Sequence, residues 1–582
     1  MKKYISVLIA AIMILILFPA GAFAQDTIPE MEESEVRALA EGNCYHVANE
    51  GNDTNDGLSW AMPLKTLEKA LSLAVDGDTI YVYAGIYDLT VPLDITKDVK
   101  IYGGFKSGEL SPDQRTLDSP PLSILDASYS CRVFNLLDRT NATVIDGFVI
   151  RNGIAVEGGG IQNVNSSPIL ANLTFLNNAA TDRGGAIYNT YSSPTLTNVI
   201  IEENTATNGG GMYNEYSSPT LTDVKFNRNS ARNNGGGMYN ETSSPTMINV
   251  DFCENSAGND GGGIYNDASS STINSVRFFD NSARTNGGGI NNLNSVLIAN
   301  LSIMKGNTSD GNGGAIHNDS SQLVIMSCDL RGNSAAIGGG AIYNSNSSSN
   351  VTNCSFTGNE STENGGAIYN GNGSPLAITN ATISGNKSDG TGGGIFNDSS
   401  DEMSLYNTIL IGNSDGIGGG ISLIRNSIVQ DRSDAINGNL DATNITADNV
   451  FVSPIPPGQS VEGDFHLKEG SPAIDAGSTD YWDDSKYSYE FLDNQTLLSF
   501  LGDDWGLIED IVGTPRIVNG TIDIGAYEAE LFPTTTTTTI TTGSTSSNPR
   551  TGDEPSVGLL IALMSVAGAG LLALFIRRRL VN

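Results

Sequence analysis

Side chains that could do chemistry gather in two places, one near each end of the sequence. Asp53, Asn55 and Asp56 lie on a glycine-bounded stretch and offer the oxygen ligands that Ca²⁺ prefers, so they form a candidate calcium site. Near the other end, the segment from Tyr481 to Asp510 is rich in aspartate and contains tryptophan. Paired carboxylates serve glycoside hydrolases, so this segment is a candidate sugar or calcium site. We favour a structural role for both places, the second as a polar end cap.

Other reactive residue types are sparse. His46, His317 and His466 are far apart in sequence and give no metal-ligand cluster. The 5 cysteines are too few for a disulfide scaffold in a chain of 582 residues. Cys328 and Cys354 fill a position that valine holds in neighbouring repeats, so we expect them to pack in a core, with a bridge between them as an open alternative. We predict no cofactor apart from the possible calcium.

One aromatic side chain recurs at a fixed position in a repeated motif. This tyrosine stripe comprises Tyr188, Tyr213, Tyr239, Tyr265, Tyr343 and Tyr369. If the motif lies on stacked strands, the rings are spaced by about 4.8 Å, close to the length of a sugar unit, and the stripe could bind a glycan. Rings at that distance cover each other's faces, so we favour cross-strand stabilisation.

The repeats indicate how these residues are held. The motif Gly-Gly-(Gly or Ala)-(Ile or Met)-x-Asn recurs from Ile161 to Ile421, at ten steps of which nine are 26 or 27 residues and one is 25. A fixed period of this length predicts a solenoid. Each period holds three apolar stretches, so we predict an all-β, right-handed parallel β-helix with three strands per coil. Counting from Tyr81 to Glu528 gives roughly 17 coils at this period.

Two asparagines per repeat predict internal ladders. One ladder runs through Asn163, Asn189, Asn214, Asn240, Asn266, Asn292, Asn318, Asn344, Asn370 and Asn397. The other runs through Asn178, Asn204, Asn229, Asn255, Asn281, Asn307, Asn333, Asn359, Asn386 and Asn413. Side-chain amides stacked at this spacing can bond to those above and below. We therefore interpret the high asparagine content as structural.

Coils of constant length also bear on function. Enzymes on β-helices build their clefts from long loops, and loops are where sites collect in repeat proteins. The regular repeats leave no room for such loops. We therefore favour a protein without catalytic residues that binds glycans or partner surfaces. A polysaccharide lyase or glycoside hydrolase is the alternative. A structural coat protein without a specific ligand is a further alternative.

The repeats resemble a known family. The pairing of Gly-Gly-Ala-Ile, as at Gly184 to Ile187, with Phe-x-x-Asn, as at Phe226 to Asn229, is similar to the repeat of the polymorphic outer membrane proteins. That resemblance covers residues 158–426 and implies a β-helical surface adhesin. The translocating barrel of that family is missing from this sequence.

The flanks carry a second resemblance. Residues 45–57, Trp60 and residues 77–82 are similar to the entry segment of pectate-lyase-like surface β-helix proteins. In this segment Leu64, Leu67, Leu71 and Ala74 fall on one face of a helix, which predicts a helical cap over the open N-terminal end of the core. Residues 470–477 and 523–528 resemble the closing module of surface β-helix proteins with variable anchors.

The two ends of the chain predict its location. Lys2 and Lys3 precede an apolar run that closes at Ala24, which predicts a secretory signal peptide cut after that residue. Residues 557–576 are an apolar stretch long enough to cross a bilayer as a C-terminal transmembrane helix, and a basic tail follows them. We expect the rest of the chain to be extracellular.

A pentapeptide before this apolar stretch resembles the LPxTG sorting signal of Gram-positive surface proteins. It consists of Asn548, Pro549, Arg550, Thr551 and Gly552. The resemblance implies that a sortase cuts between Thr551 and Gly552 and joins the protein to cell wall peptidoglycan. Asn548 stands where the family has leucine, which leaves open which sortase accepts it; without sorting, the helix would anchor the protein in the membrane.

The sequence thus divides into seven parts. They are a signal peptide at 1–24, an acidic disordered segment at 25–43, an N-terminal cap with the first coils at 44–157, regular repeats at 158–430, C-terminal coils with the closing module at 431–530, a Thr/Ser-rich stalk at 531–547 and the sorting region at 548–582. The net charge of −35 disfavours nucleic acid and anionic lipid as partners. The expected partners are the sortase, peptidoglycan, and glycans or host or partner cell surfaces.

Overall fold

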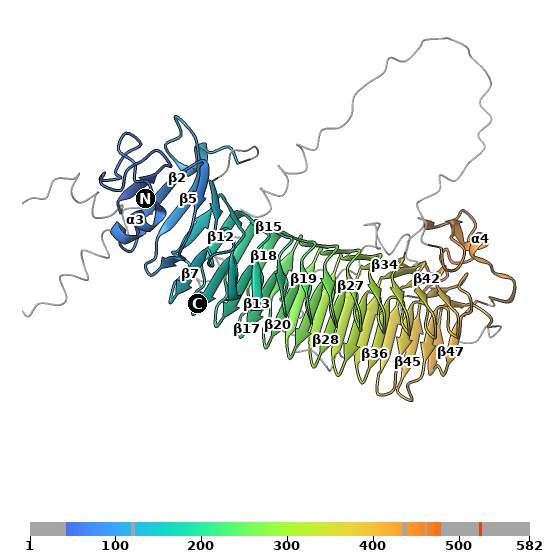
Figure 1. Ribbon diagram of the computed structural model, residues 1–582. Coiled ribbons are helices and arrows are strands. Elements are labelled where there is room, and N and C mark those ends of the chain that lie inside the picture. The colour runs from blue at the N-terminus through green and yellow to red at the C-terminus, as the bar shows by residue number, and fades with distance from the viewer. Residues whose placement is uncertain are drawn as a thin grey trace, which may run out of the picture. The chain divides into compact units, whose positions relative to one another are not determined.

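The protein forms a right-handed parallel β-solenoid (Figure 1). The computed structural model describes residues 42–117, 123–432, 439–440, 442–459, 463–478 and 523–526. Each coil contributes strands to three long sheets, which we name A, B and C. The predicted fold class is confirmed for the solenoid, whereas the predicted transmembrane stretch at 557–576 lies outside the described residues. Among the helices that are described, none is long and apolar enough to cross a membrane.

Sheet B has 13 strands, and those from β11 to β44 contain the repeated Ile or Met motif. The predicted last copy at Ile421 is wrong, because Ile417 of β47 is the residue that pairs with Ile395. Its strands are β4 (Leu93–Ile95), β7 (Phe134–Leu137), β11 (Ile161–Val164), β14 (Ile187–Thr190), β17 (Met212–Glu215), β20 (Met238–Glu241), β24 (Ile264–Asp267), β28 (Ile290–Leu293), β32 (Ile316–Asp319), β36 (Ile342–Ser345), β40 (Ile368–Asn370), β44 (Ile395–Asn397) and β47 (Ile417–Gly419). Equivalent residues pair directly from strand to strand, as Ile187 pairs with Met212. The sequence period is therefore the length of one coil.

Sheet A joins the second and third apolar stretches of each coil into one bent sheet. In β12 (Ile169–Leu176), β15 (Thr195–Glu202) and β18 (Thr220–Asn227), both stretches lie on a single eight-residue strand. A residue with positive φ, such as Asn198 at 54°, bends the strand at its middle. From β21 (Thr246–Ile248) and β22 (Asp251–Cys253) onward, the same bend separates two short strands.

Sheet C corrects the predicted division of the coil. Its 10 strands run from β10 (Ile154–Glu157) to β43 (Lys387–Ser388), and most are two residues long. Their inward side chains are small, such as Ala231 and Ala257. Strands this short carry no apolar stretch, so the three apolar stretches that were predicted to form the three strands of a coil belong to only two sheets. The recurring Ser-Ala pair at 230–231, 256–257 and 282–283 is the missed signal.

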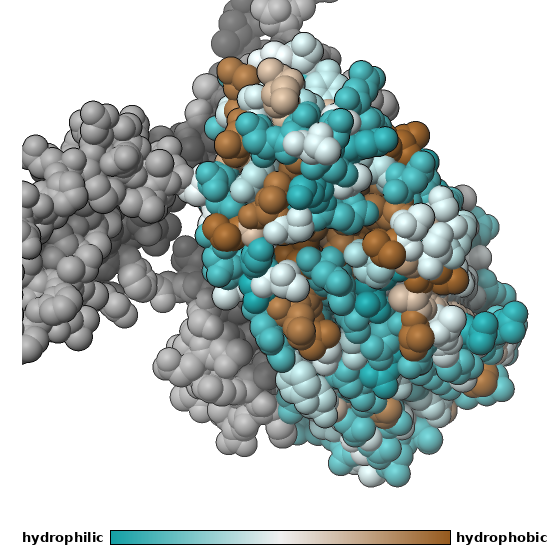
Figure 2. Space-filling model, turned by 60° about the vertical axis from the view of Figure 1, so that its left-hand side comes forward, coloured by the Kyte–Doolittle hydropathy of each residue, from teal (hydrophilic) through white to brown (hydrophobic). Residues whose placement is uncertain are grey.

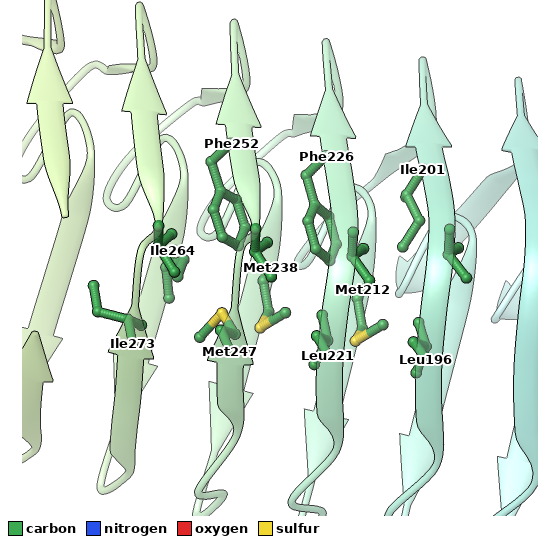
Figure 3. Close-up of a cluster of buried hydrophobic side chains, with 14 of the residues drawn as sticks. Leu196, Ile201, Met212, Leu221, Phe226, Met238, Met247, Phe252, Ile264 and Ile273 are labelled. Atoms are coloured by element: carbon green, nitrogen blue, oxygen red, sulfur yellow. The ribbon is translucent and has the colours of Figure 1, made fainter. Parts of the chain in front are cut away.

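The core is a continuous stack of apolar side chains (Figure 3). Met212 and Met238 of sheet B and Phe226 and Phe252 of sheet A lie in this stack, and all four are fully buried. Phe226, Phe252 and Phe278 stack face to face, with ring centroids 4.6 and 4.9 Å apart. Each coil therefore buries its apolar residues against its neighbours, as a solenoid requires.

Both asparagine ladders are confirmed. Asn189 Nδ2 donates to Asn214 Oδ1 at 2.8 Å in the first ladder, and Asn229 donates from both its backbone N and Nδ2 to Asn255 Oδ1 at 3.0 Å in the second. A third ladder of buried serines was not predicted. Each backbone N–H donates to the next Oγ, through Ser166, Ser192, Ser217, Ser243, Ser269, Ser295, Ser321, Ser347, Ser374 and Ser399.

A short helix covers the N-terminal end, as predicted. Helix α3 (Leu67–Leu73) begins after Thr66, whose side chain accepts from Lys69 N. It packs against β4 of sheet B and against β1 (Cys44–Val47), which begins sheet A. Leu67 and Ala74 are buried there, and Leu64 is buried just ahead of the helix. The first coil is thereby closed to edge pairing.

The C-terminal end of the described chain departs from the expected rod of roughly 17 coils. After β49 (Ile428–Val429), the chain leaves the solenoid and folds back over the outer face of sheet A. Its apolar residues there include Phe451 of β50 (Phe451–Ser453) and Phe465 of β51 (Asp464–Leu467), which pack with Ile409 and Ile411 of the last coils. Coils were overcounted because this segment lies beside the rod and does not lengthen it.

The outward residues of sheet A change where this segment covers them. At one position the uncovered coils carry Asp251 and Arg277, whereas the covered coils carry Thr382 and Ile409, which are fully buried. At the neighbouring turn, Gly385 has a φ of 70°, and a Cβ there would lie 2.7 Å from Ile455 Cγ1. Glycine is therefore needed at this turn both for its conformation and for the close approach.

Candidate functional site

Aromatic side chains cluster on the outer face of sheet A in the first coils. His46 of β1, Tyr81 of β2 (Thr79–Tyr83) and Tyr102 of β5 (Lys100–Phe105) occupy equivalent positions on neighbouring strands. Trp60, from the loop before α3, and Phe105, at the end of β5, complete the group. We call these five residues the N-terminal aromatic cluster.

The rings of this cluster meet mainly edge to face. His46 lies 4.6 Å from Trp60 at an interplanar angle of 73°, and 5.7 Å from Tyr81 at 87°. Tyr81 and Tyr102 are 6.1 Å apart at 64°. Phe105 is fully buried beneath Trp60 and Tyr81, while the other four side chains are partly exposed. The cluster thus combines a buried base with a partly exposed aromatic surface.

Two loops are fixed around the cluster. The Arg115 guanidinium lies 5.2 Å from the centre of the Tyr102 ring, and its side chain is only 4% exposed. It pairs with Asp146 at 3.1 Å and donates to the Gly103 carbonyl at 2.7 Å. Trp60 Nε1 donates to the Glu109 carbonyl at 3.2 Å, which joins the loop before α3 to the loop after β5. Ligand binding here would need little ordering of these loops.

The polar groups of the cluster favour hydrogen bonding over catalysis. Burial raises the pKa of Tyr81 to about 12 and that of the Cys44 thiol to about 11, so both stay protonated at neutral pH. The carboxylate of Asp146, next in the row after Tyr102, is paired with Arg115. Cys44 therefore does not supply a thiolate nucleophile, and Asp146 does not supply an unpaired carboxylate as a general base.

The tyrosine stripe lies on the outer face of sheet B and is largely covered. Tyr188, Tyr213, Tyr239 and Tyr265 are each less than a tenth exposed and form one apolar cluster. The rings of Tyr213 and Tyr239 stack with centroids 4.6 Å apart and an interplanar angle of 10°. The rings of Tyr343 and Tyr369 also lie 4.6 Å apart, at an interplanar angle of 13°. The stripe is interrupted at Asn291 and His317. The ring faces are therefore turned to each other, as the stabilising alternative requires.

Hydrogen bonds and charges also hold the stripe. Tyr188 donates to Glu215, and Tyr213 donates to Glu241 Oε2 at 2.6 Å. Arg183 lies 5.2 Å from the centre of the Tyr213 ring and pairs with Glu215 at 3.2 Å. Burial raises the pKa of Tyr265 to about 12. The glycan-binding role of the stripe remains a prediction, and these contacts occupy the hydroxyls of Tyr188 and Tyr213.

The candidate calcium residues serve the loop that contains them. Asp53 accepts from the backbone N–H groups of Lys65 and Thr66 at 2.9 and 3.0 Å. Asp56 accepts from Leu58 N, and Asn55 Nδ2 donates to the Pro63 carbonyl. Asp53, Asn55 and Asp56 line an open pocket together with Lys69. Across the part of the chain that the structure describes, no group of three His, Cys, Asp or Glu side chains could hold a metal ion. Calcium binding at Asp53, Asn55 and Asp56 remains a prediction.

The histidines and cysteines do not come together into a reactive site. His317 Nδ1 lies 2.8 Å from Asn291 Oδ1, and burial lowers its pKa to about 4. His466 lies beside Asp464 at 2.6 Å. Cys328 and Cys354 are fully buried free thiols, and each Sγ lies 3.2 Å from the backbone carbonyl of the residue two positions earlier. The core-packing prediction for these two cysteines is confirmed.

Several predicted sites lie outside the described residues. These are the cleavage position at Ala24, the sorting signal at Asn548–Gly552 and the acidic segment from Tyr481 to Asp510. They stay predictions. The N-terminal aromatic cluster, by contrast, was not predicted as a site. Its signal was the alternation of inward apolar and outward aromatic residues at Tyr45–Val47, Ile80–Tyr83 and Ile101–Tyr102.

Family comparisons agree with the β-solenoid. The profile of a family described as a protein of unknown function, DUF1565, matches residues 49–286. The profile of the Chlamydia polymorphic membrane protein repeat matches residues 302–319 and 353–371. No curated protein matches the chain. The second match bears out the resemblance stated for the repeats.

Three solved structures are similar in fold only loosely. They are pectate lyase Pel9A (TM-score 0.29, 13% identity, covering 84% of this chain and 97% of that one), a rhamnogalacturonan lyase (0.23, 14%, 74% and 97%) and the GH136 lacto-N-biosidase from Eubacterium ramulus (0.19, 12%, 57% and 65%). At these TM-scores the likeness carries no argument about activity. Taken together, the solenoid and the repeat matches show that this chain is a parallel β-helix protein with repeats similar to those of the Chlamydia polymorphic membrane proteins.

Proposed function

We propose that this protein is displayed on the outside of the cell and acts there by binding, as an adhesin for glycans or partner surfaces. The observation that supports this most is the regularity of sheet B. From β11 to β44, strand follows strand in direct register without an inserted loop. A rod of this kind presents flat faces and holds its N-terminal coils at one end, which suits binding better than a catalytic cleft.

The mode of attachment is part of the same proposal. The leader that ends at Ala24 would direct secretion, and a sortase would join Thr551 to the cell wall after cutting before Gly552. In a Gram-positive host, Thr551→Ala should move the protein from the wall fraction to the membrane fraction. Equal wall attachment of this variant and the unchanged chain would contradict sorting and leave a plain membrane anchor.

The binding proposal is tested with a glycan array. The full-length protein is applied with and without Ca²⁺, and the release of reducing ends is measured for every glycan that it binds. We expect binding without release. Release would instead identify a hydrolase or lyase. If no glycan is bound, a coat protein without a specific ligand becomes the better account.

A further inference from the structure

We propose that the N-terminal aromatic cluster is a binding site for a neutral oligosaccharide, an inference that rests on the proposed glycan-binding function. The cluster lies on the first coils, where the chain carries the loops that the regular repeats lack. Its partly exposed members are His46, Trp60, Tyr81 and Tyr102.

Ring orientation distinguishes this cluster from the tyrosine stripe. A sugar ring packs its C–H groups on the face of an aromatic ring, so a face must be free. In the stripe, Tyr213 and Tyr239 are almost parallel at 10° and hide their faces from solvent. In the cluster, Tyr81 meets His46 at 87° and Tyr102 at 64°. An edge-to-face contact covers only one face of one partner. Phe105 lies 4.4 Å from Tyr81 at 31°, and Arg115 lies over Tyr102, so each of these two rings can offer a ligand only its other face.

The row has the spacing and polar groups that a sugar chain needs. His46, Tyr81 and Tyr102 stand on three successive strands, spaced by about 4.8 Å, which is close to one hexose unit per strand. The pKa values of Tyr81 and Tyr102 are raised mainly by burial, so both phenols are protonated at neutral pH. Tyr81 shares a hydrogen bond with the Cys44 side chain, which leaves Tyr102 as the clearer donor to a ligand. An aromatic floor with a few such donors is typical of small-ligand sites.

The charges favour a neutral ligand. The positive charge beneath the cluster, on Arg115, is balanced by Asp146 at 3.1 Å. The whole chain carries a net charge of −35, which repels polyanions such as oligogalacturonate. An uncharged oligosaccharide avoids this repulsion.

The face of the molecule shown in Figure 2 does not suit a large apolar partner. Figure 2, turned to bring the N-terminal end forward, shows separate hydrophobic patches divided by hydrophilic surface. A protein docking through apolar contact needs a continuous patch of several hundred Å². Patches of this kind suit a small, amphipathic ligand such as a short sugar chain.

Trp60 provides a reporter within the proposed site. The chain has 3 tryptophans, so replacing Trp482 and Trp505 by phenylalanine leaves Trp60 as the source of tryptophan fluorescence. The full-length chain in this background is titrated with cellohexaose, maltohexaose, xylohexaose and mannohexaose, and with a galacturonate hexamer as the anionic probe. We expect at least one neutral hexasaccharide to shift Trp60 emission, and the anionic probe to bind at least about fivefold more weakly.

Matched variants separate binding from folding. Tyr102→Ala should weaken the binding of that hexasaccharide about fivefold or more, and Tyr102→Phe less, because it keeps the ring. Tyr216→Ala is the control, since it removes an exposed tyrosine from the middle of the rod and should leave binding unchanged. Thermal melting of each variant shows whether the fold is kept. If Tyr102→Ala fails to fold, the binding of the hexasaccharide by Tyr102→Phe still tests the site.

The outcomes distinguish this inference from the proposed function. If a hexasaccharide binds without shifting Trp60 emission, and binds Tyr102→Ala and Tyr102→Phe as tightly as the unchanged chain, the site is elsewhere and only the present inference fails. If the full-length chain binds no glycan on the array, both fail. A preference for the anionic hexamer would overturn the assignment of a neutral ligand.

Discussion

The regular coils and the N-terminal coils use aromatic side chains in opposite ways. In the regular coils, the tyrosines of the stripe pack on one another wherever neighbouring coils both carry one, and Tyr188, Tyr213, Tyr239 and Tyr265 are almost fully covered. In the N-terminal coils, the rings meet edge to face and four of them stay partly exposed. Perfect repetition favours stacking, because equal residues in register lie face to face. Departure from the repeat, with its loops, leaves ring surface for a ligand.

This comparison assigns stability to the regular coils and binding to the N-terminal coils. Substitutions in the regular coils should therefore lower the free energy of unfolding without changing glycan binding. The largest effect is expected for Phe252→Ala, because Phe252 is fully buried between Phe226 and Phe278. We expect a loss of about 3 to 5 kcal/mol in denaturant unfolding. A loss of binding in the folded variant would break the comparison.

Loss of one rung of a ladder should come next. Asn255→Ala removes the oxygen that accepts from both N–H groups of Asn229 and the amide that donates to the Phe226 carbonyl. Buried groups without partners should cost about 2 to 3 kcal/mol. Asn227→Ala, at a partly exposed position two residues before the ladder, is the control and should cost less than about 0.5 kcal/mol. Equal losses would mean that the ladder does not stabilise the coil.

His317 gives the regular coils a dependence on acid pH. Its folded pKa is lowered by burial from 6.5 to about 4, so between these values the unfolded chain takes up a proton that the folded chain resists. Stability should fall by about 1 to 2 kcal/mol as the pH is lowered through this window. His317→Tyr, which introduces the residue that the next coil carries at this position (Tyr343), should remove this part of the pH dependence in thermal melts. An unchanged pH profile would contradict the assignment.

The stripe should depend on its hydroxyls to a smaller extent. Tyr213→Phe removes the hydrogen bond to Glu241 and keeps the stacked ring. We expect a loss of about 1 kcal/mol, with glycan binding unchanged. Weaker glycan binding by the folded variant would indicate that the stripe is a glycan site and would contradict the assignment of binding to the N-terminal coils.

The smallest effect is expected for the exposed pair Tyr191 and Tyr216. Their rings stack 5.1 Å apart, and Tyr191 has a φ of 49°. Tyr191→Asn loses the stacking but places a residue that tolerates this conformation, so the stability should change by less than about 0.5 kcal/mol. A larger loss in thermal melts would show that exposed stacking stabilises the rod.

Periodicity determined how much of this could be predicted from the sequence. The sheet B strands and both asparagine ladders repeat in residue type, so alignment of the repeats was enough to predict them. Sheet C was missed because its short strands present only alanine or serine inward, as at Ala231 and Ala257. The fold-back near Ile455 was missed because a contact between distant segments leaves only a change in surface residues, such as Gly385.

The site was harder to predict for the same reason. Trp60, Tyr81 and Tyr102 come from three coils of unequal length, so no period relates them. Tyr81 and Tyr102 meet through their outward positions on adjacent strands, and Trp60 joins them from the loop before α3. The stripe, which is periodic, was easy to find and drew attention as a candidate, although its regularity is what hides its ring faces.

Amide hydrogen exchange with and without the bound neutral hexasaccharide tests the central claim most directly. We predict that the sugar slows exchange in β2, β5 and the loops at 57–63 and 106–117, and leaves the sheet B strands from β14 to β44 unchanged. Slower exchange along those sheet B strands, with no change in β2 and β5, would contradict the division of roles between the two regions.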